Sequence, residues 1–253
     1  MSTTTTAAPL AATAFGSYIR SFVTDVPADL GSEAAQYYRK TIKRFPEEAI
    51  YIYSFKEHRM LYAAGWEEVF GYGDDEINMH ILVDLMVPRF APFSHDLFDK
   101  AMMFIQTKST DLDQYSFTME VKKKHKDGAE VPVVVKVGVL EYADGQMTSV
   151  IGRLQVNRSL NFGQVMRYAA YGPDKEEFED ILNKALFRHL AISGKEKEAL
   201  ALVAKGYSFK EIAYYLGVSH SAVEKRILPL YKRFSVKSLP HLVSFAYDNY
   251  ILP

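Results

Sequence analysis

The stretch GYSFKEIAYYLGVSHSAVEKRI, residues 206–227, contains two helix-start signals separated by a single glycine. Ser208 is followed three residues later by Glu211, a capping-box spacing in which the hydroxyl and the carboxylate each accept a backbone N–H at a helix start. Gly217 stands where the end of that helix favours a left-handed residue, and Ser219 can cap a second helix. Two short helices joined by so tight a turn must share one core.

The apolar residues of this stretch recur at helical spacing and give each helix an inward face. These faces are Ile212, Ala213 and Leu216 in the first helix, expected at 208–217, and Val223, Ile227 and Leu230 in the second, expected at 219–233. This is the pattern of a helix-turn-helix, whose second helix can lie in the major groove of DNA. An ordinary helical hairpin produces the same local pattern, so the stretch alone leaves both interpretations open.

Two further helices are expected around this pair. Residues 192–206 open with a second capping-box spacing, Ser193 to Glu196, and apolar residues from Leu239 onward again recur at helical steps. The pattern therefore predicts one small bundle of four helices. Residues 190–253 hold nine Lys or Arg against five Asp or Glu, whereas the rest of the chain holds 21 against 26. A basic segment of this kind suits contact with phosphate.

The stretch from about Leu190 to Tyr250 resembles the DNA-binding domain of the LuxR family of bacterial transcription regulators. The resemblance is carried by Ser193, Glu196, Glu198 and Leu200, by Gly206 with KEIAYYLGVS, by AVEKR and by SVKS. It implies control of transcription by dimers that bind paired half-sites on double-stranded DNA.

Three positions depart from the family pattern. Ala222 stands where the family usually has Thr, and Arg226 stands where it often has His. Pro229 lies inside the expected second helix, where a proline removes one backbone hydrogen bond and costs about 3 kcal/mol or forces a kink. The half of the helix before Pro229 can still be straight.

With the apolar face of the second helix turned inward, its opposite face is expected to meet DNA. The candidates for contact with base edges are His220, Ser221, Glu224 and Lys225. The candidates for contact with phosphates are Lys210, Ser219, Arg226, Lys232 and Arg233. A solvated side chain is the alternative at each position.

The first half of the chain alternates in a different way. Strands are expected at 49–55 and 59–65, several short helices between 66 and 107, and then three antiparallel strands separated by two Asp-Gly turns. Residues 46–157 resemble a PAS domain, through WEEVFGYGDDEI at 66–77 and the last three strands. The resemblance implies a five-stranded antiparallel sheet that cups a pocket and serves as a sensor or a dimerising module. The fold class is therefore α+β.

The remaining segments complete a four-part organisation. Residues 1–45 are expected to be a tail, disordered at its start, with a helix at 32–45. Residues 158–188 are expected to be a helical linker, interrupted at Gly172 and Pro173, that either packs against the sheet or acts as a signalling or dimerising helix. Residues 189–253 are expected to be the LuxR-type helix-turn-helix DNA-binding domain.

The sequence carries no enzyme signature and no evident cofactor motif. The absence of cysteine excludes disulfides, thiolate nucleophiles and cysteine-metal sites. The acids of GDDEI at 73–77 are interpreted as helix caps rather than metal ligands, and His95 as structural rather than a haem ligand. No apolar run is long enough to cross a membrane, and the N-terminus makes a poor secretory signal, so a cytoplasmic protein is expected.

Two functional hypotheses follow. In the first, a PAS module that senses a small molecule or a partner protein controls a homodimeric DNA-binding regulator. In the second, the chain is a PAS-based interaction or ligand-sensor module whose C-terminal bundle no longer binds DNA specifically, with Pro229 as the cause. The ligand of the PAS module is not specified by the sequence.

Overall fold

The computed structural model describes residues 24–88, 90–160, 166–190, 192–234, 236–248 and 251–252. The chain divides into two compact units. The first comprises Met1–Asn161 with Tyr168–Leu186, and the second comprises Phe162–Arg167 with Phe187–Pro253. The tail expected to be disordered, residues 1–14, lies outside the described residues. The α+β fold class is confirmed.

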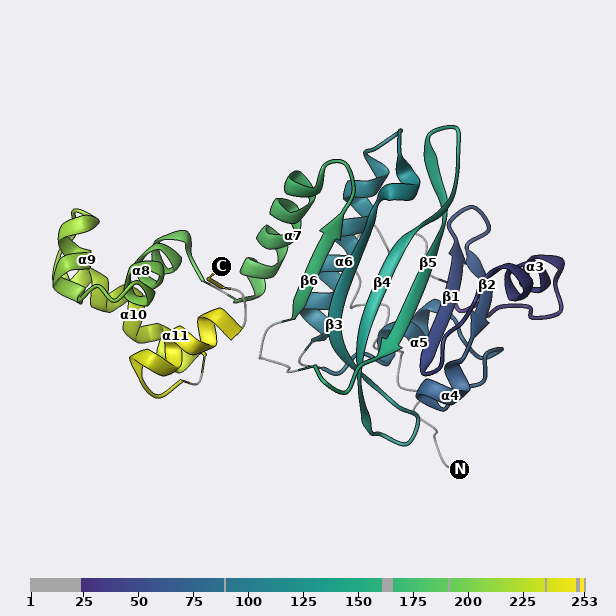
Figure 1. Cartoon of the computed structure of the whole chain (residues 1–253), viewed down its shortest axis with the longest axis horizontal. Helices are drawn as coiled ribbons and strands as arrows, with labels where there is room; N and C mark the ends of the chain where they lie inside the picture. The colour runs from purple at the N-terminus through teal and green to yellow at the C-terminus, as the bar shows by residue number, and fades with distance from the viewer. Residues whose placement is uncertain are drawn as a thin grey trace, which may run out of the picture. The chain divides into compact units, whose positions relative to one another are not determined.

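The first unit is built on one six-stranded sheet with the order β2-β1-β5-β4-β3-β6 (Figure 1). Its strands are β1 (Glu48–Ser54), β2 (Arg59–Ala64), β3 (Ser116–Lys124), β4 (Glu130–Ala143), β5 (Gln146–Val156) and β6 (Arg167–Tyr171). β1 pairs antiparallel with β2 and β5, and β4 pairs antiparallel with β3 and β5. The first five strands are therefore those that the PAS resemblance implies.

The sixth strand corrects a prediction. The segment before Gly172 was expected to be helical, but Arg167–Tyr171 forms β6 beside β3 at the edge of the sheet. A five-residue piece gains little as an isolated helix, whereas the edge of β3 offers it a row of unpaired backbone groups. Gly172 follows with a φ of +142°, and a Cβ there would lie 2.5 Å from the Tyr115 ring, so the close turn requires glycine.

Three α-helices and a short 3-10 helix connect β2 to β3. They are α4 (Trp66–Phe70), α5 (Met79–Asp84), α6 (Ala91–Gln106) and η1 (Leu112–Gln114), and α6 is longer than the short helices expected here. Two of the three acids at residues 73–77 accept hydrogen bonds from backbone N–H groups. Asp74 accepts one from the Trp66 N–H at 2.8 Å, at the start of α4, and Glu76 accepts one from the Gly73 N–H at 2.7 Å. Asp74 therefore caps α4, in line with the prediction, whereas Glu76 closes a turn and the helix that follows, α5, is capped by Asn78 instead.

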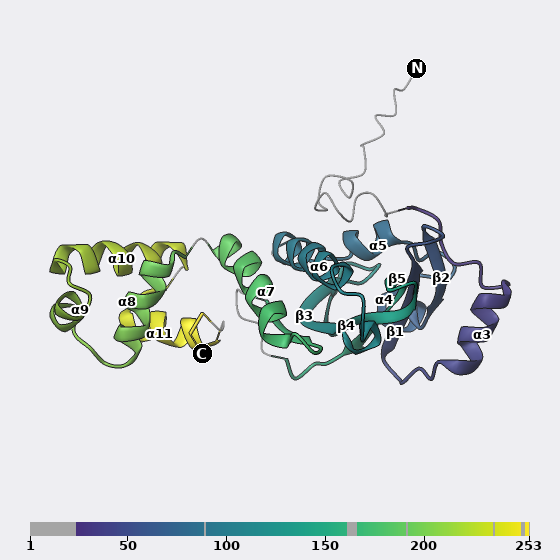
Figure 2. The same cartoon turned by 90° about the horizontal axis from the view of Figure 1, so that it is seen from above.

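The two faces of the sheet carry different helices. Successive residues of a strand point to opposite faces, so Ile50 and Ile52 of β1 face one way and Tyr51 the other. Ile50 and Ile52 form a buried cluster with Ala35 and Tyr38 of α3 (Glu33–Thr41). Tyr51 instead lines a cavity with residues of α5 and α6, which run along the opposite face (Figure 2).

The part of α7 (Lys175–Leu190) that belongs to the first unit packs against α6. The ring of Phe178 is fully buried and stacks on Phe104, with ring centroids 4.6 Å apart. Lys108 pairs with Asp174 at 2.9 Å and with Glu177 at 3.1 Å. This part of α7 therefore packs on α6, whereas packing against the sheet was the expectation, and the signalling or dimerising role stays a prediction.

The second unit contains the predicted helices, α8 (Gly194–Ala204), α9 (Phe209–Tyr215), α10 (His220–Arg233) and α11 (Leu239–Asp248). Its core includes Leu200, Val203, Ile212, Val223, Ile227, Leu230, Leu242 and Ala246, all buried. α10 continues for a full turn beyond Pro229, to Arg233. Figure 2 shows α10 as one continuous helix. Among the described residues of the chain, no helix is long and apolar enough to cross a membrane.

Candidate nucleic-acid interface

The start of α9 is held by the predicted capping box. The Ser208 hydroxyl oxygen accepts a hydrogen bond from the Glu211 N–H at 3.3 Å, and the Glu211 carboxylate accepts one from the Ser208 N–H at 2.8 Å. The same carboxylate also accepts a hydrogen bond from the Ser208 hydroxyl, and these hydrogen bonds lower the pKa of Glu211. The N–H groups of Ser208 and Glu211, which have no acceptor within the helix, therefore each donate a hydrogen bond to a side chain.

The turn between α9 and α10 is a Schellman motif centred on Gly217. The Val218 N–H donates to the carbonyl of Ala213 at 3.0 Å, and the Gly217 N–H donates to that of Tyr214 at 3.3 Å. Gly217 has a φ of +62°, a left-handed conformation that glycine adopts without the penalty of a Cβ. The end of α9 and the entry into α10 are therefore fixed by backbone hydrogen bonds.

The start of α10 fixes which face of that helix meets solvent. The Ser219 hydroxyl oxygen accepts a hydrogen bond from the Ala222 N–H at 3.2 Å and caps the helix. Val223, Ile227 and Leu230 are fully buried. The opposite face of the first two turns is therefore turned away from the core.

The base-edge candidates lie on that outer face. His220, Ser221 and Lys225 are exposed, and Glu224 is partly exposed. His220 Nδ1 lies 3.7 Å from the Glu224 carboxylate, so these two side chains are close enough to pair when the imidazole is protonated. Lys225 has no ion-pair partner in the part of the chain that the structure describes. Its ammonium group is available to a ligand.

The phosphate candidates fall into two groups. Lys210 and Lys232 are exposed, as is Ser219, whose hydroxyl already caps α10. Nη1 of Arg233 lies 3.1 Å from the carboxylate of Glu196 in α8. The Glu196 side chain is 13% exposed, and this ion pair connects α10 to α8. Nη1 of Arg226 is buried and has no hydrogen-bond partner among the described residues. Arg233 is thus engaged within the fold, whereas the exposed Lys210 and Lys232 are accessible to a ligand.

Two exposed aromatic residues of α9 were not among the candidates. Tyr214 is 89% exposed and Tyr215 is 63% exposed, and the Tyr215 ring packs edge-on against Tyr207 at 5.2 Å. Large aromatic side chains are usually at least half buried, and a tyrosine hydroxyl can donate to a phosphate oxygen. The signal in the sequence was a Tyr pair directly after the inward residues Ile212 and Ala213.

The capping box gives a direct test of the local structure. Replacing Ser208 by alanine is expected to lower the free energy of unfolding of the second unit by about 1 kcal/mol, because one helix cap is lost. Ser221→Ala is the matched control, since Ser221 is an exposed serine that caps no helix. Denaturant unfolding of the two variants measures the difference, and equal losses would contradict the assigned role of Ser208.

Comparison with known families agrees with this geometry. The family model described as "Bacterial regulatory proteins, luxR family" matches residues 190–246. The oxygen regulatory protein NreC of Staphylococcus carnosus (strain TM300) is 41% identical to this chain over 61 residues. That match covers 24% of this chain and spans 28% of the length of NreC.

Solved structures give weaker likenesses. A phage VqmA–DPO complex matches with a TM-score of 0.33 at 15% identity, over 87% of this chain and 92% of that one. The structure of the Vibrio cholerae VqmA dimer without target DNA matches with a TM-score of 0.34 at 13% sequence identity. The match covers 87% of this chain and 89% of that one. A PAS domain from Colwellia psychrerythraea gives 0.37 at 16% identity, over 49% of this chain and 98% of that domain. These scores are too low to carry an argument about function.

The capped helices α8, α9 and α10 contain the motifs that carry the LuxR resemblance, and the family match covers the same residues. Residues 190–246 match the family of bacterial regulatory proteins called luxR, and this confirms the resemblance of the C-terminal segment to the LuxR-type DNA-binding domain.

Proposed function

We propose that this chain is a cytoplasmic transcription regulator in which the first unit receives a signal and the second unit binds specific DNA sequences. The observation that carries the proposal is the outer face of α10, where Ser221 and Lys225 are exposed while Val223 and Ile227 seal the inner face. A helix presented in this way can enter the major groove of DNA.

The side chains on this face divide by the chemistry that they offer. Lys225 can donate to the acceptor atoms of guanine, and Glu224 can accept from the amino group of cytosine. Lys210 and Lys232 lie outside the first two turns of α10 and offer charge to the phosphates. The first pair would specify the sequence, and the second pair would hold the domain on the duplex.

The regulator is proposed to act as a homodimer on paired half-sites. One short recognition helix contacts only a few base pairs, so a specific operator requires two of them, with a spacing set by the dimer. The PAS-like unit, residues 46–157, would supply the input, through a small molecule or a partner protein. The LuxR family is one of transcription regulators, and no catalytic role is proposed.

The test is selection of bound duplexes from a random DNA library by the full-length protein at two salt concentrations. An enriched motif with two-fold symmetry, bound more weakly at the higher salt, is expected because phosphate contacts release counterions. If no sequence is enriched and binding hardly changes with salt, the proposal fails and the alternative of an interaction module is favoured.

Two lysine variants test the proposed division of labour. Lys225→Ala is expected to relax the preference at one base pair by about 1–3 kcal/mol, whereas Lys232→Ala weakens binding to all sequences alike and reduces the salt slope by about 1. Lys56→Ala, which removes an exposed lysine of the first unit, is the control and should change neither. Equal, sequence-independent losses in the first two variants would contradict the assignment.

A further inference from the structure

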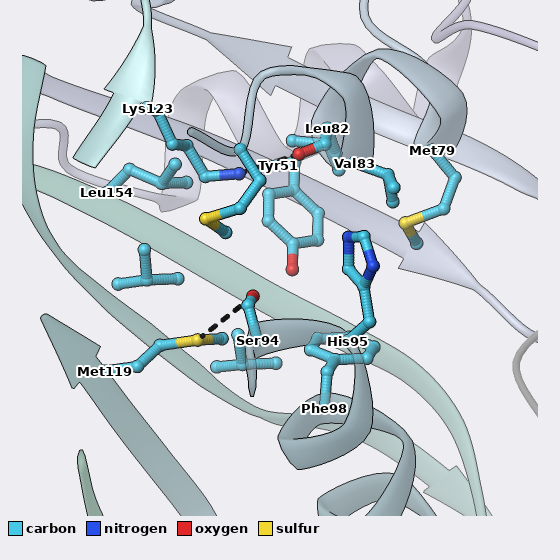
Figure 3. Close-up of a pocket in the computed structure, with 13 residues that line it drawn as sticks. Tyr51, Met79, Leu82, Val83, Ser94, His95, Phe98, Met119, Lys123 and Leu154 are labelled. Atoms are coloured by element: carbon cyan, nitrogen blue, oxygen red, sulfur yellow. Dashed lines mark hydrogen bonds between the residues drawn. The ribbon is translucent and has the colours of Figure 1, made fainter. Parts of the chain in front are cut away.

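The first unit encloses a cavity between the sheet and the helices α5 and α6, shown in Figure 3. The space inside it is about 50 Å³, and most of its wall is apolar. Three methionines, Met79, Met86 and Met119, form part of that wall. Methionine side chains are flexible and polarisable, so such a wall can adjust to a ligand larger than the space found here.

The polar groups in the wall share one property. Tyr51, Ser94, His95 and Lys123 all line the cavity and are all buried. Figure 3 shows the Tyr51 hydroxyl, the Ser94 hydroxyl and the His95 imidazole directed toward the same space. Each of the four residues can donate a hydrogen bond, and none of the described residues that line the cavity is an Asp or a Glu. The cavity therefore favours a ligand that accepts hydrogen bonds.

Lys123 is the most unusual member of this group. It is 5% exposed, and its ammonium group donates one hydrogen bond, to the carbonyl of Leu82 at 2.7 Å. Burial lowers the pKa of Lys123 to about 7, and no carboxylate compensates the desolvation. An ammonium group can donate three hydrogen bonds, so two protons of the charged form have no acceptor among the described residues.

We propose that this cavity binds a small monocarboxylate, with an apolar body against the methionines and its carboxylate paired with Lys123. This inference rests on the proposed function, since it names the class of signal that the first unit receives. A bound carboxylate would satisfy the charged lysine in a medium of low dielectric constant, where the pair is strong if it is well hydrogen-bonded. The hydroxyl of Tyr51 is a further donor for such a ligand, and that of Ser94 becomes one if it gives up its hydrogen bond to Met119 Sδ at 3.7 Å.

The proposal predicts how affinity changes with pH. A carboxylate favours the charged form of Lys123, so binding takes up a proton when the free lysine is neutral. Above about pH 7 the affinity is therefore expected to fall by up to tenfold for each pH unit. Tyr51 and His95 are the other titratable groups that line the cavity, and burial raises the pKa of Tyr51, which leaves it neutral over this range.

The experiment uses calorimetry on the full chain with short aliphatic carboxylates and benzoate, and with the corresponding amides as neutral controls, between about pH 6 and pH 9. Binding of one or more carboxylates that weakens above pH 7, with the amides bound at least tenfold more weakly, is expected. Lys123→Met should abolish the preference for the carboxylate and the pH dependence, whereas Lys124→Met, at the exposed neighbouring position outside the cavity wall, should keep both.

Two outcomes would overturn the proposal. One is that no carboxylate binds, and the other is that carboxylates and amides bind equally well or bind unchanged in Lys123→Met. The pH dependence of the wild-type protein needs no variant, so it tests the proposal independently of Lys123→Met. The calorimetry is done without DNA. If no carboxylate binds, the result of the DNA selection still stands, and if no DNA sequence is selected, the measured ligand binding still stands.

Discussion

Replacing Pro229 by alanine is expected to raise the free energy of unfolding of the second unit by about 2–3 kcal/mol. Pro229 lies inside α10, is exposed, and has no N–H to donate to the carbonyl of Lys225. Alanine restores that hydrogen bond and removes the steric conflict of the ring with the preceding turn. Hydrogen exchange of the backbone amides of α10, together with denaturant unfolding, measures the gain.

The matched control for this prediction is Pro240→Ala. Pro240 is also exposed, but it is the second residue of α11, where the N–H of any residue has no intrahelical acceptor. Its replacement is therefore expected to change the stability by much less. If the two variants gain equally, the cost at Pro229 does not come from the interior position, and the argument fails.

The same comparison bears on the alternative that Pro229 has disabled DNA binding. α10 begins at His220 and continues through Pro229 to Arg233, so the proline has not ended the helix. The base-edge candidates all precede it, from His220 to Lys225. We expect Pro229→Ala to stabilise the fold while leaving the selected DNA motif unchanged. A motif that appears only in the variant would instead favour the interaction-module hypothesis.

Local signals in the sequence predicted the second unit well. Each capping box and each glycine turn depends on residues within a few positions of one another, so the chain needs no distant partner to specify them. The inward positions Val223, Ile227 and Leu230 followed from helical spacing and are buried. The role of each candidate side chain toward DNA stays a prediction.

The features that the sequence did not predict depend on distant contacts. The strand β6 is specified by the free edge of β3, about fifty residues earlier, and not by its own alternation. Likewise, the ion pair of Arg233 with Glu196 arises from the packing of α10 on α8. A helical wheel places Arg233 on the surface but cannot show that this side chain already has a partner.

The alternation of residues in β3 indicates the burial of Lys123. In β3 the residues Phe117, Met119 and Val121 alternate with polar ones, and strand periodicity places Lys123 on the same face. The run of three lysines at 122–124 hides this alternation, since a charge run is ordinarily read as exposed. Position 123 is buried, whereas Lys124 is exposed.

Replacing Lys123 by methionine is expected to stabilise the first unit by about 2–4 kcal/mol at pH 7. The pKa of this lysine falls from its ordinary value of 10.5 to about 7 on burial. The unfolded chain therefore binds a proton that the folded chain lacks between these two values, and the free energy of unfolding rises as the pH rises from about 7 to 10.5. Below pH 7 the full cost is present. Methionine fills a similar volume without that cost, although the carbonyl of Leu82 loses its donor.

Unfolding by denaturant at a series of pH values distinguishes this explanation from a general effect of surface charge. Wild-type protein should gain stability from about pH 7 to pH 10.5, and Lys123→Met should lack that gain. Lys124→Met, at the exposed neighbouring position, should keep it. A pH dependence that persists in Lys123→Met would show that another group causes it. Loss of the dependence together with a higher stability would mean that the chain keeps a destabilising lysine in its cavity, which is the cost expected of a residue retained for a charged ligand.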